Sequence, residues 1–327
     1  MKYRILGKTG YKVSEVSFGA WAIGGSWGKV NDKESLAALE RGIELGINFI
    51  DTADVYGDGR SEKVISKLLK SKKDKIYVAT KAGRRLDPHV AEGYTIKNIE
   101  KFIDRSLKNL QVDKLDLLQL HCPPTQVFYI PELFEGLENL KKKGKIAHFG
   151  VSVEKVEEAI KAIEYPGVAT VQIIFNIFRQ RPKELFFKLA KRKNVGIIAR
   201  VPYASGLLTG RMSIDSKFEK EDHRNFNRHG EAFDVGETFA GVDFDEGIKA
   251  ITKLKKIKPK NISMAQMALK WILMHPEVSC AIPGARNIEQ IESNTSASKI
   301  AKLNAQTLKK IELIYNSQIK KLVHQRW

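Results

Sequence analysis

The sequence predicts a (β/α)8 barrel, the TIM-barrel class of fold, with a short N-terminal hairpin and a C-terminal helix. Short apolar runs alternate with longer amphipathic stretches along the chain, which is typical of parallel strands joined by helical crossovers. Eight such units fall within about 300 residues and match a closed barrel better than an open doubly wound sheet. The 327 residues contain no Pro/Ser-rich linker or internal repeat, so we expect one domain over residues 1–327.

The predicted elements follow in order from the N-terminus. Two short segments, 3–6 and 12–14, flank a glycine-containing turn and predict a hairpin. Apolar runs predict eight strands, at 16–18, 48–51, 76–80, 115–120, 147–152, 170–175, 196–200 and 279–282. Apolar residues at helical spacing predict eight helices, at 33–45, 61–69, 95–110, 131–143, 156–163, 183–192, 245–256 and 288–293.

Two segments stand outside this alternation. Residues 206–244 are long, polar and contain glycine, which is typical of a functional or mobile loop, so they are a candidate lid. The segment that begins at Asn304, a good N-cap residue, carries apolar residues at helical spacing and predicts a helix packed outside the barrel. Trp327 is given no role.

Charge and composition exclude several classes of protein. Lys and Arg number 56 against 38 Asp and Glu, a net charge of +18, but the lysine clusters at 70–75, 141–145 and 255–260 end helical stretches. These clusters lack interleaved aromatic residues and a recognisable binding module, so we do not expect nucleic acid as a partner. No apolar run reaches membrane-spanning length, so no membrane partner is expected. The two cysteines and the lack of an export signal favour the cytoplasm.

Sequence motifs for other chemistries are incomplete in this chain. Gly57 and Gly59 begin a dinucleotide-binding pattern, but Glu62 stands where its third glycine belongs. Tyr203 stands where a serine nucleophile elbow needs its first glycine. The seven histidines show no metal-binding spacing, so we expect no metal site.

Four polar residues lie at or just beyond the ends of predicted strands, where barrel enzymes carry their active sites. Asp51, Lys81 and His121 come from three consecutive strands, and Tyr56 lies five residues past Asp51. Alone, each residue is more often a helix cap, a packing residue or a buried core residue. Together they predict a site, because a buried ammonium needs a carboxylate and Asp51 supplies one. We expect the Lys81 charge to lower the pKa of Tyr56 below about 10, which makes Tyr56 a usable general acid.

The motifs DTADVYG, ATK, LLQLH and GVS, in this order on successive strands, resemble those of the aldo-keto reductases. The resemblance runs from about residue 3 to beyond residue 315 and is similar in particular to the bacterial branch related to the potassium-channel β-subunits. It implies hydride transfer from a nicotinamide to an aldehyde or ketone. It also implies catalytic roles for four residues, with Tyr56 as proton donor, Lys81 lowering its pKa, Asp51 pairing with Lys81, and His121 orienting the carbonyl oxygen.

The resemblance further implies how NADPH is bound. The segment IPGARNIEQIESN resembles the one that holds the adenosine end, where the guanidinium of Arg286 suits a 2′-phosphate and favours NADPH. The run SGLLTG resembles the loop that wraps the pyrophosphate with backbone N–H groups. Ser152 and Gln172 match the residues that hold the nicotinamide carboxamide. The expected cofactor-binding residues are Trp21, Ser152, Gln172, Arg200, Ser205, Gly206, Leu208, Gly210, Gly284, Arg286, Gln290 and Asn294.

Two positions depart from the family pattern. Val153 stands where an Asn usually follows GVS, which removes one amide contact to the carboxamide. Arg200 stands where an aromatic residue often stacks on the nicotinamide, and its charge is expected to disfavour the oxidised ring and so favour reduction. For the substrate, Trp21, Trp27 and Tyr129 are expected to form an aromatic wall suited to aldehydes or ketones.

Two other functions stay open at this point. The same residues are compatible with a slow or non-catalytic NADPH-binding subunit that reports redox state to a partner, as the resemblance to channel β-subunits allows. A basic barrel that binds nucleic acid through its lysine surface is the third interpretation. The sequence predicts neither the physiological carbonyl nor the oligomeric state.

Overall fold

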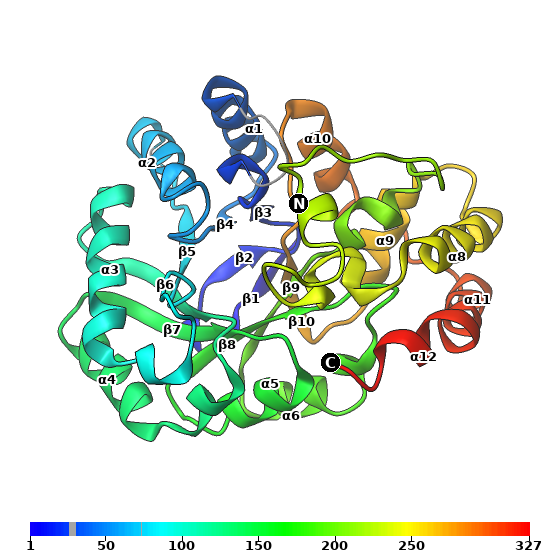
Figure 1. Ribbon diagram of the computed structural model, residues 1–327. Helices are drawn as coiled ribbons and strands as arrows, with labels where there is room; N and C mark the ends of the chain where they lie inside the picture. The colour runs from blue at the N-terminus through cyan, green and yellow to red at the C-terminus, as the bar shows by residue number, and fades with distance from the viewer. Residues whose placement is uncertain (26–30, 73) are drawn as a thin grey trace.

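The computed structural model describes residues 1–25, 31–72 and 74–327, which form a ring of parallel strands surrounded by helices (Figure 1). Each of the eight strands in the described part of this sheet pairs in parallel with the next along the chain. The predicted (β/α)8 fold is therefore confirmed. The strands are β3 (Phe18–Gly19), β4 (Phe49–Asp51), β5 (Tyr77–Ala82), β6 (Leu115–His121), β7 (Ile146–Ser152), β8 (Val168–Ile174), β9 (Gly196–Arg200) and β10 (Val278–Ala281).

The ring closes between β3 and β10. The amide of Ser17 donates a hydrogen bond to the carbonyl of Ala281 (2.9 Å), and the amide of Gly19 donates to that of Pro283 (3.0 Å). A Cβ at Gly19 would lie 2.5 Å from the carbonyl oxygen of Ile282, so this seam leaves no room for a side chain. Closure places the segment that follows β10 beside the loop that follows β3.

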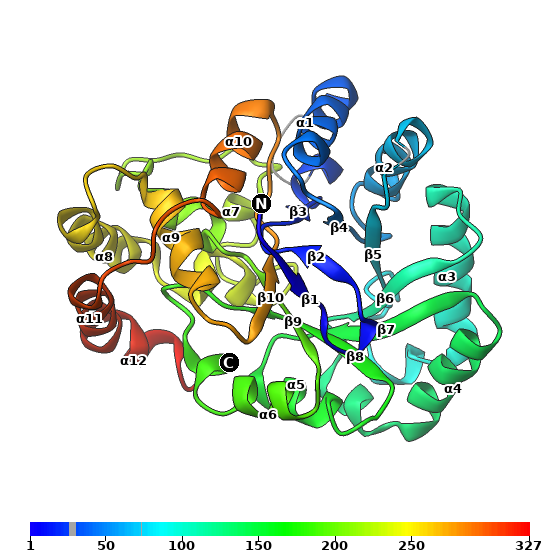
Figure 2. The ribbon, with the colours of Figure 1, turned by 180° about the vertical axis from the view of Figure 1, so that it is seen from behind.

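The predicted hairpin, β1 (Tyr3–Ile5) and β2 (Lys12–Ser14), covers the end of the barrel at which the strands begin (Figure 2). Leu6 and Val13 share a buried cluster with Phe49 and Leu117 from the barrel strands. Apolar side chains thus fill this end, and polar chemistry is left to the opposite end, where the strands finish.

All eight predicted helices are present, with bounds shifted by up to about three residues, as is usual for helix ends. None of the helices in the described ranges is long and apolar enough to cross a bilayer, while the cytoplasmic location stays a prediction. The helices are α1 (Asp32–Glu44), α2 (Arg60–Ser71), α3 (Ile96–Leu110), α4 (Pro131–Lys142), α5 (Val156–Ala162), α6 (Phe186–Arg192), α8 (Phe244–Ile257) and α10 (Ile288–Ser296).

A further helix, α9 (Met264–Leu273), was not predicted and lies between α8 and β10. Every residue from 267 to 273 is buried, Lys270 included, so this helix is covered on all sides over those residues. A capping box marks its start: the side chains of Ser263 and Gln266 each accept a hydrogen bond from the other's backbone amide.

The long segment 206–244 joins β9 to α8 and contains only short helical turns in its interior. These are α7 (His223–Phe226), η7 (Val235–Glu237) and η8 (Phe239–Gly241). The segment lies over the end of the barrel at which the strands finish (Figure 1).

The C-terminal helix is present as α11 (Ala305–Ile314), and the side chain of Asn304 accepts a hydrogen bond from the amide of Thr307, as its predicted capping role requires. Beyond the short α12 (Lys320–Val323), Trp327 is buried. Its indole Nε1 donates to Asp234 (2.8 Å), and the guanidinium of Arg179 lies 4.2 Å from its ring centroid. Trp327, which had no predicted role, therefore fastens the long segment 206–244 to the outside of the barrel.

Candidate active site

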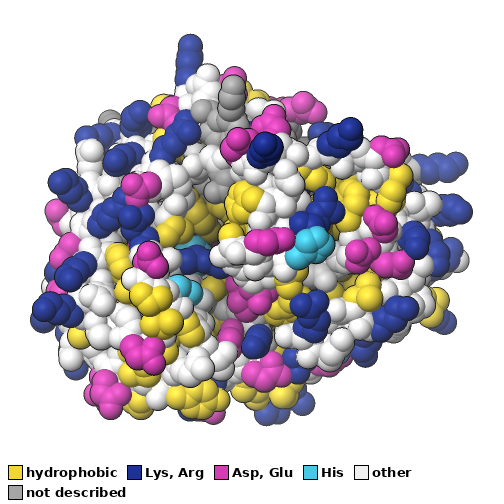
Figure 3. Space-filling model, viewed as in Figure 1, with side chains coloured by type: hydrophobic (Ala, Val, Ile, Leu, Met, Phe, Trp, Pro, Cys, Tyr) yellow, Lys and Arg dark blue, Asp and Glu magenta, His cyan; other side chains and the backbone are white. Residues whose placement is uncertain are grey.

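A cavity of about 490 Å³ opens at the carboxyl end of the strands. Figure 3 looks onto this end and shows histidine, basic and acidic side chains gathered at the centre of the face. Of the residues expected from the sequence, the cavity is lined by Trp21, Asp51, Tyr56, His121, Ser152, Gln172, Arg200, Ser205, Gly206, Gly284, Arg286, Gln290 and Asn294. Lys81 lies behind this lining, bonded to Tyr56, while Leu208 and Gly210 do not reach the cavity.

Lys81, near the end of β5, is buried and uses all three of its donors. Its Nζ donates to Asp51 Oδ2 (2.6 Å), to the carbonyl of Thr52 (2.8 Å) and to the hydroxyl of Tyr56 (3.2 Å). The second carboxylate oxygen of Asp51 accepts from Gln119 (3.0 Å) and Gln172 (2.7 Å). Both charges are thus paired and hydrogen-bonded, which is the condition for keeping an ion pair in a protein interior.

The pKa of Tyr56 does not follow the prediction. Burial raises the pKa of this phenol, and the Lys81 ammonium offsets only part of the rise, since the nearby Asp51 carboxylate acts against it. The expected lowering below about 10 is therefore wrong for this form of the protein, because the desolvation of a buried phenolate exceeds the attraction of one ammonium. Tyr56 is a neutral phenol at neutral pH. Because its oxygen accepts from Lys81, its own proton is available to the cavity.

His121, the last residue of β6, is also buried and lies edge-on to Tyr56, with 5.9 Å between ring centroids. Burial, the Arg84 guanidinium and the Lys81 ammonium hold its pKa well below the usual range, so the imidazole is neutral. Its Nδ1 has no hydrogen-bond partner among the described residues. The site therefore presents a phenol and a neutral imidazole side by side.

The far end of the cavity carries an unpaired cation. Arg286 is half-buried, and its guanidinium makes no hydrogen bond or ion pair within the described residues, although its backbone amide donates to Gln290 (2.8 Å). Burial and the neighbouring Arg224 guanidinium lower the pKa of Arg286. A half-buried cation that no carboxylate contacts directly among the described residues, open to a cavity, fits a phosphate group. Nearby, Asn294 donates to the carbonyl of Gly284 (3.2 Å).

The SGLLTG run has the backbone conformation expected of a loop that wraps closely around a ligand. Its side chains, however, make contacts within the protein. Ser205 and Gly206 both have positive φ (53° and 100°). The hydroxyl of Ser205 donates to the carbonyl of Glu237 (3.0 Å) and accepts from the amide of Phe239 (3.0 Å), so it holds the long segment. Leu208 is buried in the core, and Gly210 ends the turn with φ 71°.

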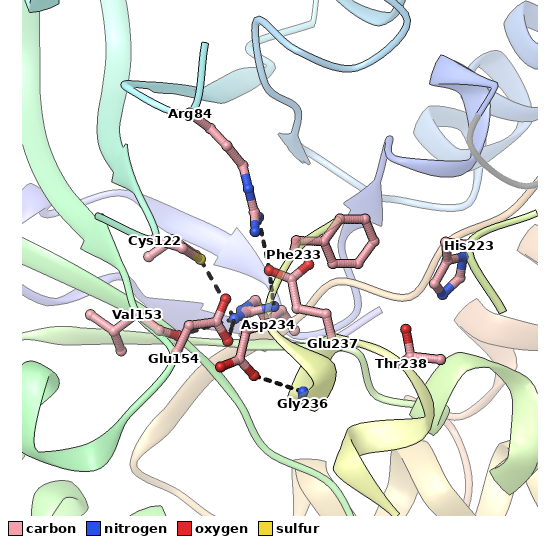
Figure 4. Close-up of polar contacts among 12 residues, drawn as sticks. Arg84, Cys122, Val153, Glu154, His223, Phe233, Asp234, Gly236, Glu237 and Thr238 are labelled. Atoms are coloured by element: carbon pink, nitrogen blue, oxygen red, sulfur yellow. Dashed lines mark hydrogen bonds and ion pairs between the residues drawn. The ribbon is translucent and has the colours of Figure 1, made fainter. Parts of the chain in front are cut away.

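Arg200 lines the cavity as predicted, but its guanidinium is bonded to acidic residues of the protein. It donates to Glu154 (2.8 Å) and to the carbonyl of Val153 (3.1 Å), and it lies 3.7 Å from Glu237. Glu237 in turn pairs with Arg84 (2.8 Å), and Figure 4 shows Arg84 and Glu237 pointing toward each other. With Glu154 and Glu237 beside it, Arg200 is not the free charge that was expected to act on a nicotinamide ring. Ser152, next to it, contacts Cys122 (3.4 Å).

Sequence reasoning missed Arg84, Glu154 and Glu237. Arg84 and Glu154 lie three and two residues beyond predicted site residues, a signal that was available, whereas Glu237 comes from the long segment. Ligand atoms of Cys122, Glu154 and Glu237 lie within 4.8 Å of one another, a spacing that also suits a metal ion. However, the two carboxylates are paired with Arg200 and Arg84, so guanidinium groups already supply the positive charge.

The aromatic wall is only partly present. Trp21 lines the cavity and stacks over Tyr56, with 6.3 Å between ring centroids. Tyr129 is 64% exposed and lies beneath Lys161, outside the lining of the cavity, so its expected place there is wrong. Trp27 falls outside the described residues. Phe233, from the long segment, also packs near Trp21, with 6.1 Å between ring centroids. It was not predicted, because no pattern in the polar sequence around it marks it as a site residue.

Comparison with known proteins agrees with this geometry. The model of the Aldo/keto reductase family matches residues 15–316. The chain is 31% identical to the aldo-keto reductase YhdN of Bacillus subtilis, over 98% of this chain and 95% of that protein. It is 28% identical to the aldo-keto reductase yakc [NADP(+)] of Schizosaccharomyces pombe, over 91% and 87%. A probable voltage-gated potassium channel subunit beta of Arabidopsis thaliana is 29% identical, over 98% of both chains.

Among solved structures, the holo form of the aldo-keto reductase AKR11C1 from Bacillus halodurans superposes with a TM-score of 0.78 at 27% identity. The alignment covers 96% of each chain. The similarity thus extends over the whole barrel and both ends of the cavity.

Proposed function

This chain belongs to the aldo/keto reductase family, and we propose that it is an NADPH-dependent reductase of aldehydes or ketones in which Tyr56 is the proton donor. The observation that carries the proposal is the hydrogen bond from Lys81 to the Tyr56 hydroxyl (3.2 Å). It leaves the phenolic proton directed away from Lys81, in a hydroxyl that lines the cavity beside His121.

The chain's own residues then divide the work. A carbonyl oxygen bound against Tyr56 and the neutral His121 accepts hydrogen bonds from both, which fixes its orientation. As negative charge develops on that oxygen, the Tyr56 proton moves to it. The phenolate that remains is stabilised by the Lys81 ammonium, which Asp51 keeps charged.

The residues fit NADPH as the cofactor that completes this chemistry. When bound, NADPH supplies the hydride, which no side chain can provide. Arg286, unpaired and half-buried, would hold the 2′-phosphate, and its fixed fork explains a preference over NADH. The S. pombe relative carries NADP(+) in its name, which supports the same choice. The remaining cavity-lining residues proposed to hold the cofactor are Trp21, Ser152, Gln172, Arg200, Ser205, Gly206, Gly284, Gln290 and Asn294.

The test is consumption of NADPH and of NADH by the purified protein against a panel of aromatic aldehydes, methylglyoxal, sugars and ketones. The proposal expects turnover with at least one of these compounds and a lower KM for NADPH than for NADH. Turnover with NADH alone would contradict the assignment of Arg286.

A redox-sensing subunit is the second candidate, favoured by the similarity to the Arabidopsis channel subunit over 98% of both chains. This candidate requires the same cofactor cavity but predicts that no carbonyl compound of the panel is reduced. Tight NADPH binding without turnover of any carbonyl would favour this candidate over the reductase.

A further inference from the structure

A second cavity, of about 320 Å³, adjoins the first at the carboxyl end of the barrel. Its lining includes Arg84, Cys122, Glu154, Lys155 and Phe233. Cys122 directly follows His121, which lines the first cavity. Two ion pairs also join the cavities, because Arg84 and Glu154 line the second while their partners Glu237 and Arg200 line the first. The second cavity therefore lies directly beside the one lined by Tyr56 and His121, with these two ion pairs shared between the linings.

The acidic residues of the second cavity are engaged within the protein. Glu158 accepts from the Thr125 hydroxyl (2.7 Å) and from the backbone amides of Glu154 and Lys155 (3.0 Å each). Asp234 accepts from the amide of Gly236 (2.6 Å), as Figure 4 shows, and from the Trp327 indole (2.8 Å). Both oxygens of Glu158 are thus engaged, whereas both hydrogen bonds of Asp234 fall on Oδ1 and none among the described residues reaches its Oδ2.

One oxygen of Glu154 accepts from Arg200 (2.8 Å). Its other oxygen is buried without a partner among the described residues. Burial, together with the Glu237 carboxylate, raises the pKa of Glu154 to about 8, so this carboxyl adds little negative charge to the cavity wall at neutral pH.

The basic residues, in contrast, have donors to spare. The guanidinium of Arg84 has five N–H donors, of which the described contacts use Nη1 alone, for Glu237. The Cζ atom of Arg84 lies 5.3 Å from the centroid of the Phe233 ring, so a face of the guanidinium packs over that ring. The ammonium of Lys155 is exposed and has no side-chain partner within the described residues. His89, the third basic group of the lining, bonds Tyr94 (2.8 Å) and is kept neutral by burial and by Arg84.

We propose that the second cavity receives the distal end of the substrate, and that Arg84 and Lys155 select carbonyl compounds that carry a carboxylate. This inference rests on the proposed function and names the substrate class of the same site. The donors that remain in the cavity belong to Arg84 and Lys155, and a carboxylate satisfies them with charge-assisted hydrogen bonds. The planar fork of Arg84 suits a carboxylate better than an isolated hydroxyl.

The experiment compares two aldehydes of nearly equal size, para-formylbenzoate and para-formylbenzamide, with benzaldehyde as the reference. The holoenzyme should show a kcat/KM for the carboxylate at least about tenfold above that for the amide, the effect of one charge-assisted contact. Raising the salt concentration should narrow the difference, because Lys155 is exposed to solvent.

Three variants test which side chain produces the preference for the carboxylate. Arg84→Lys keeps a cation beside Glu237, so the fold is retained, but it loses the fork and should reduce the preference for the carboxylate about tenfold. Lys155→Gln removes an exposed charge and should reduce it about two- to fivefold. Lys143→Gln removes the same charge directly after α4, at the opposite end of the barrel, and should leave the preference unchanged.

Binding of the two alcohol products, measured by calorimetry on the NADPH-loaded protein, supplies a readout that needs no turnover. Tighter binding of the carboxylate product that weakens in Arg84→Lys supports the inference. Equal kcat/KM for all three aldehydes, with equal product binding, overturns the substrate class and leaves the reductase intact. No turnover of any aldehyde contradicts the proposed function itself, and product binding then still decides whether the cavity recognises a carboxylate.

Discussion

Lys81 donates a hydrogen bond to the hydroxyl of Tyr56 across 3.2 Å, although the two residues lie 25 positions apart and on different elements. This contact determines where the Tyr56 hydroxyl can donate its proton. A phenol that accepts from an ammonium must send its own proton elsewhere, and the hydroxyl borders the cavity. The same ammonium is held by Asp51 at 2.6 Å, so each of the three groups depends on the other two.

Removing the counter-charge should cost stability as well as activity. In Asp51→Asn, the buried Lys81 ammonium loses its carboxylate, and we expect the free energy of unfolding to fall by about 3 to 5 kcal/mol. Urea denaturation followed by circular dichroism measures this. Asp32→Asn breaks an ion pair with Arg60 that is partly exposed, and it should cost about 1 kcal/mol or less. Equal losses in the two variants would show that the Lys81 pair is not the buried anchor described above.

Arg286 should set the cofactor preference. Its guanidinium is unpaired among the described residues, so Arg286→Ala removes a phosphate partner without breaking an internal contact of the side chain. We expect NADPH affinity to fall about 10- to 100-fold, the cost of losing charge-assisted hydrogen bonds, while NADH affinity changes little. Fluorescence titration with both cofactors measures the ratio. A parallel loss for NADH would place the phosphate elsewhere.

The pH profile of reduction should lack an acid limb near pH 6.5. His121 has a pKa held well below that value, so it stays neutral as the pH falls through 6.5, and Tyr56, whose pKa is raised above 10, stays protonated through neutral pH. We therefore expect neither residue to produce an inflection in kcat/KM near pH 6.5. An inflection near 6.5 that disappears in His121→Gln would mean that the histidine acts in its charged form.

Asp54 should make stability fall as the pH rises. Neither oxygen of its buried carboxyl has a partner in the described residues, and burial, together with the Glu62 carboxylate, raises its pKa to about 7. The folded state therefore binds a proton more tightly than the unfolded state, so the stability contributed below about pH 4 is lost as the pH rises to about 7. Asp54→Asn should be more stable than the parent protein at pH 8 and close to it at pH 4. Thermal unfolding at both pH values tests the sign, and a variant that is less stable at pH 8 would refute it.

Trp327 should order the long segment over the site. Trp327→Ala removes the hydrogen bond to Asp234 and the contact with Arg179, so backbone amides of residues 234–241 should exchange faster with deuterium while those of the barrel strands do not. Leu313→Ala, at a residue 58% exposed on α11, is the matched control and should leave exchange unchanged. Unaltered protection of 234–241 in Trp327→Ala would mean that other contacts, such as those of Glu237 and Ser205, are sufficient to hold the segment.

The sequence predicted the strands and their ends well, because strand-forming runs are local and the barrel rule then assigns a face to each end. Asp51, Lys81 and His121 were found this way. The mostly apolar run of α9 was not recognised as a helix, although the Ser263–Gln266 capping box was a signal available in the sequence. The Arg84–Glu237 pair was not predicted for another reason. The two residues lie 153 positions apart, and Glu237 belongs to a segment with little regular structure.

The electrostatic expectations were less successful than the geometric ones. The ammonium of Lys81 was expected to dominate the pKa of Tyr56, but the degree of burial, which a sequence does not give, outweighs it. Arg200 was expected to carry a free charge, but it is bonded to Glu154 and lies close to Glu237. In both cases the sign of a local charge was correct, and the surrounding desolvation and counter-charges were not predictable.

Tyr56→Phe tests the central claim most directly, because it deletes the proton and keeps the ring. The measurement is kcat/KM for the best aldehyde of the panel, taken together with NADPH affinity. We expect kcat/KM to fall by about 100-fold or more, the usual contribution of a general acid, while NADPH binds as before. Turnover close to that of the parent protein, with NADPH affinity retained, would contradict the assignment of Tyr56 as the proton donor.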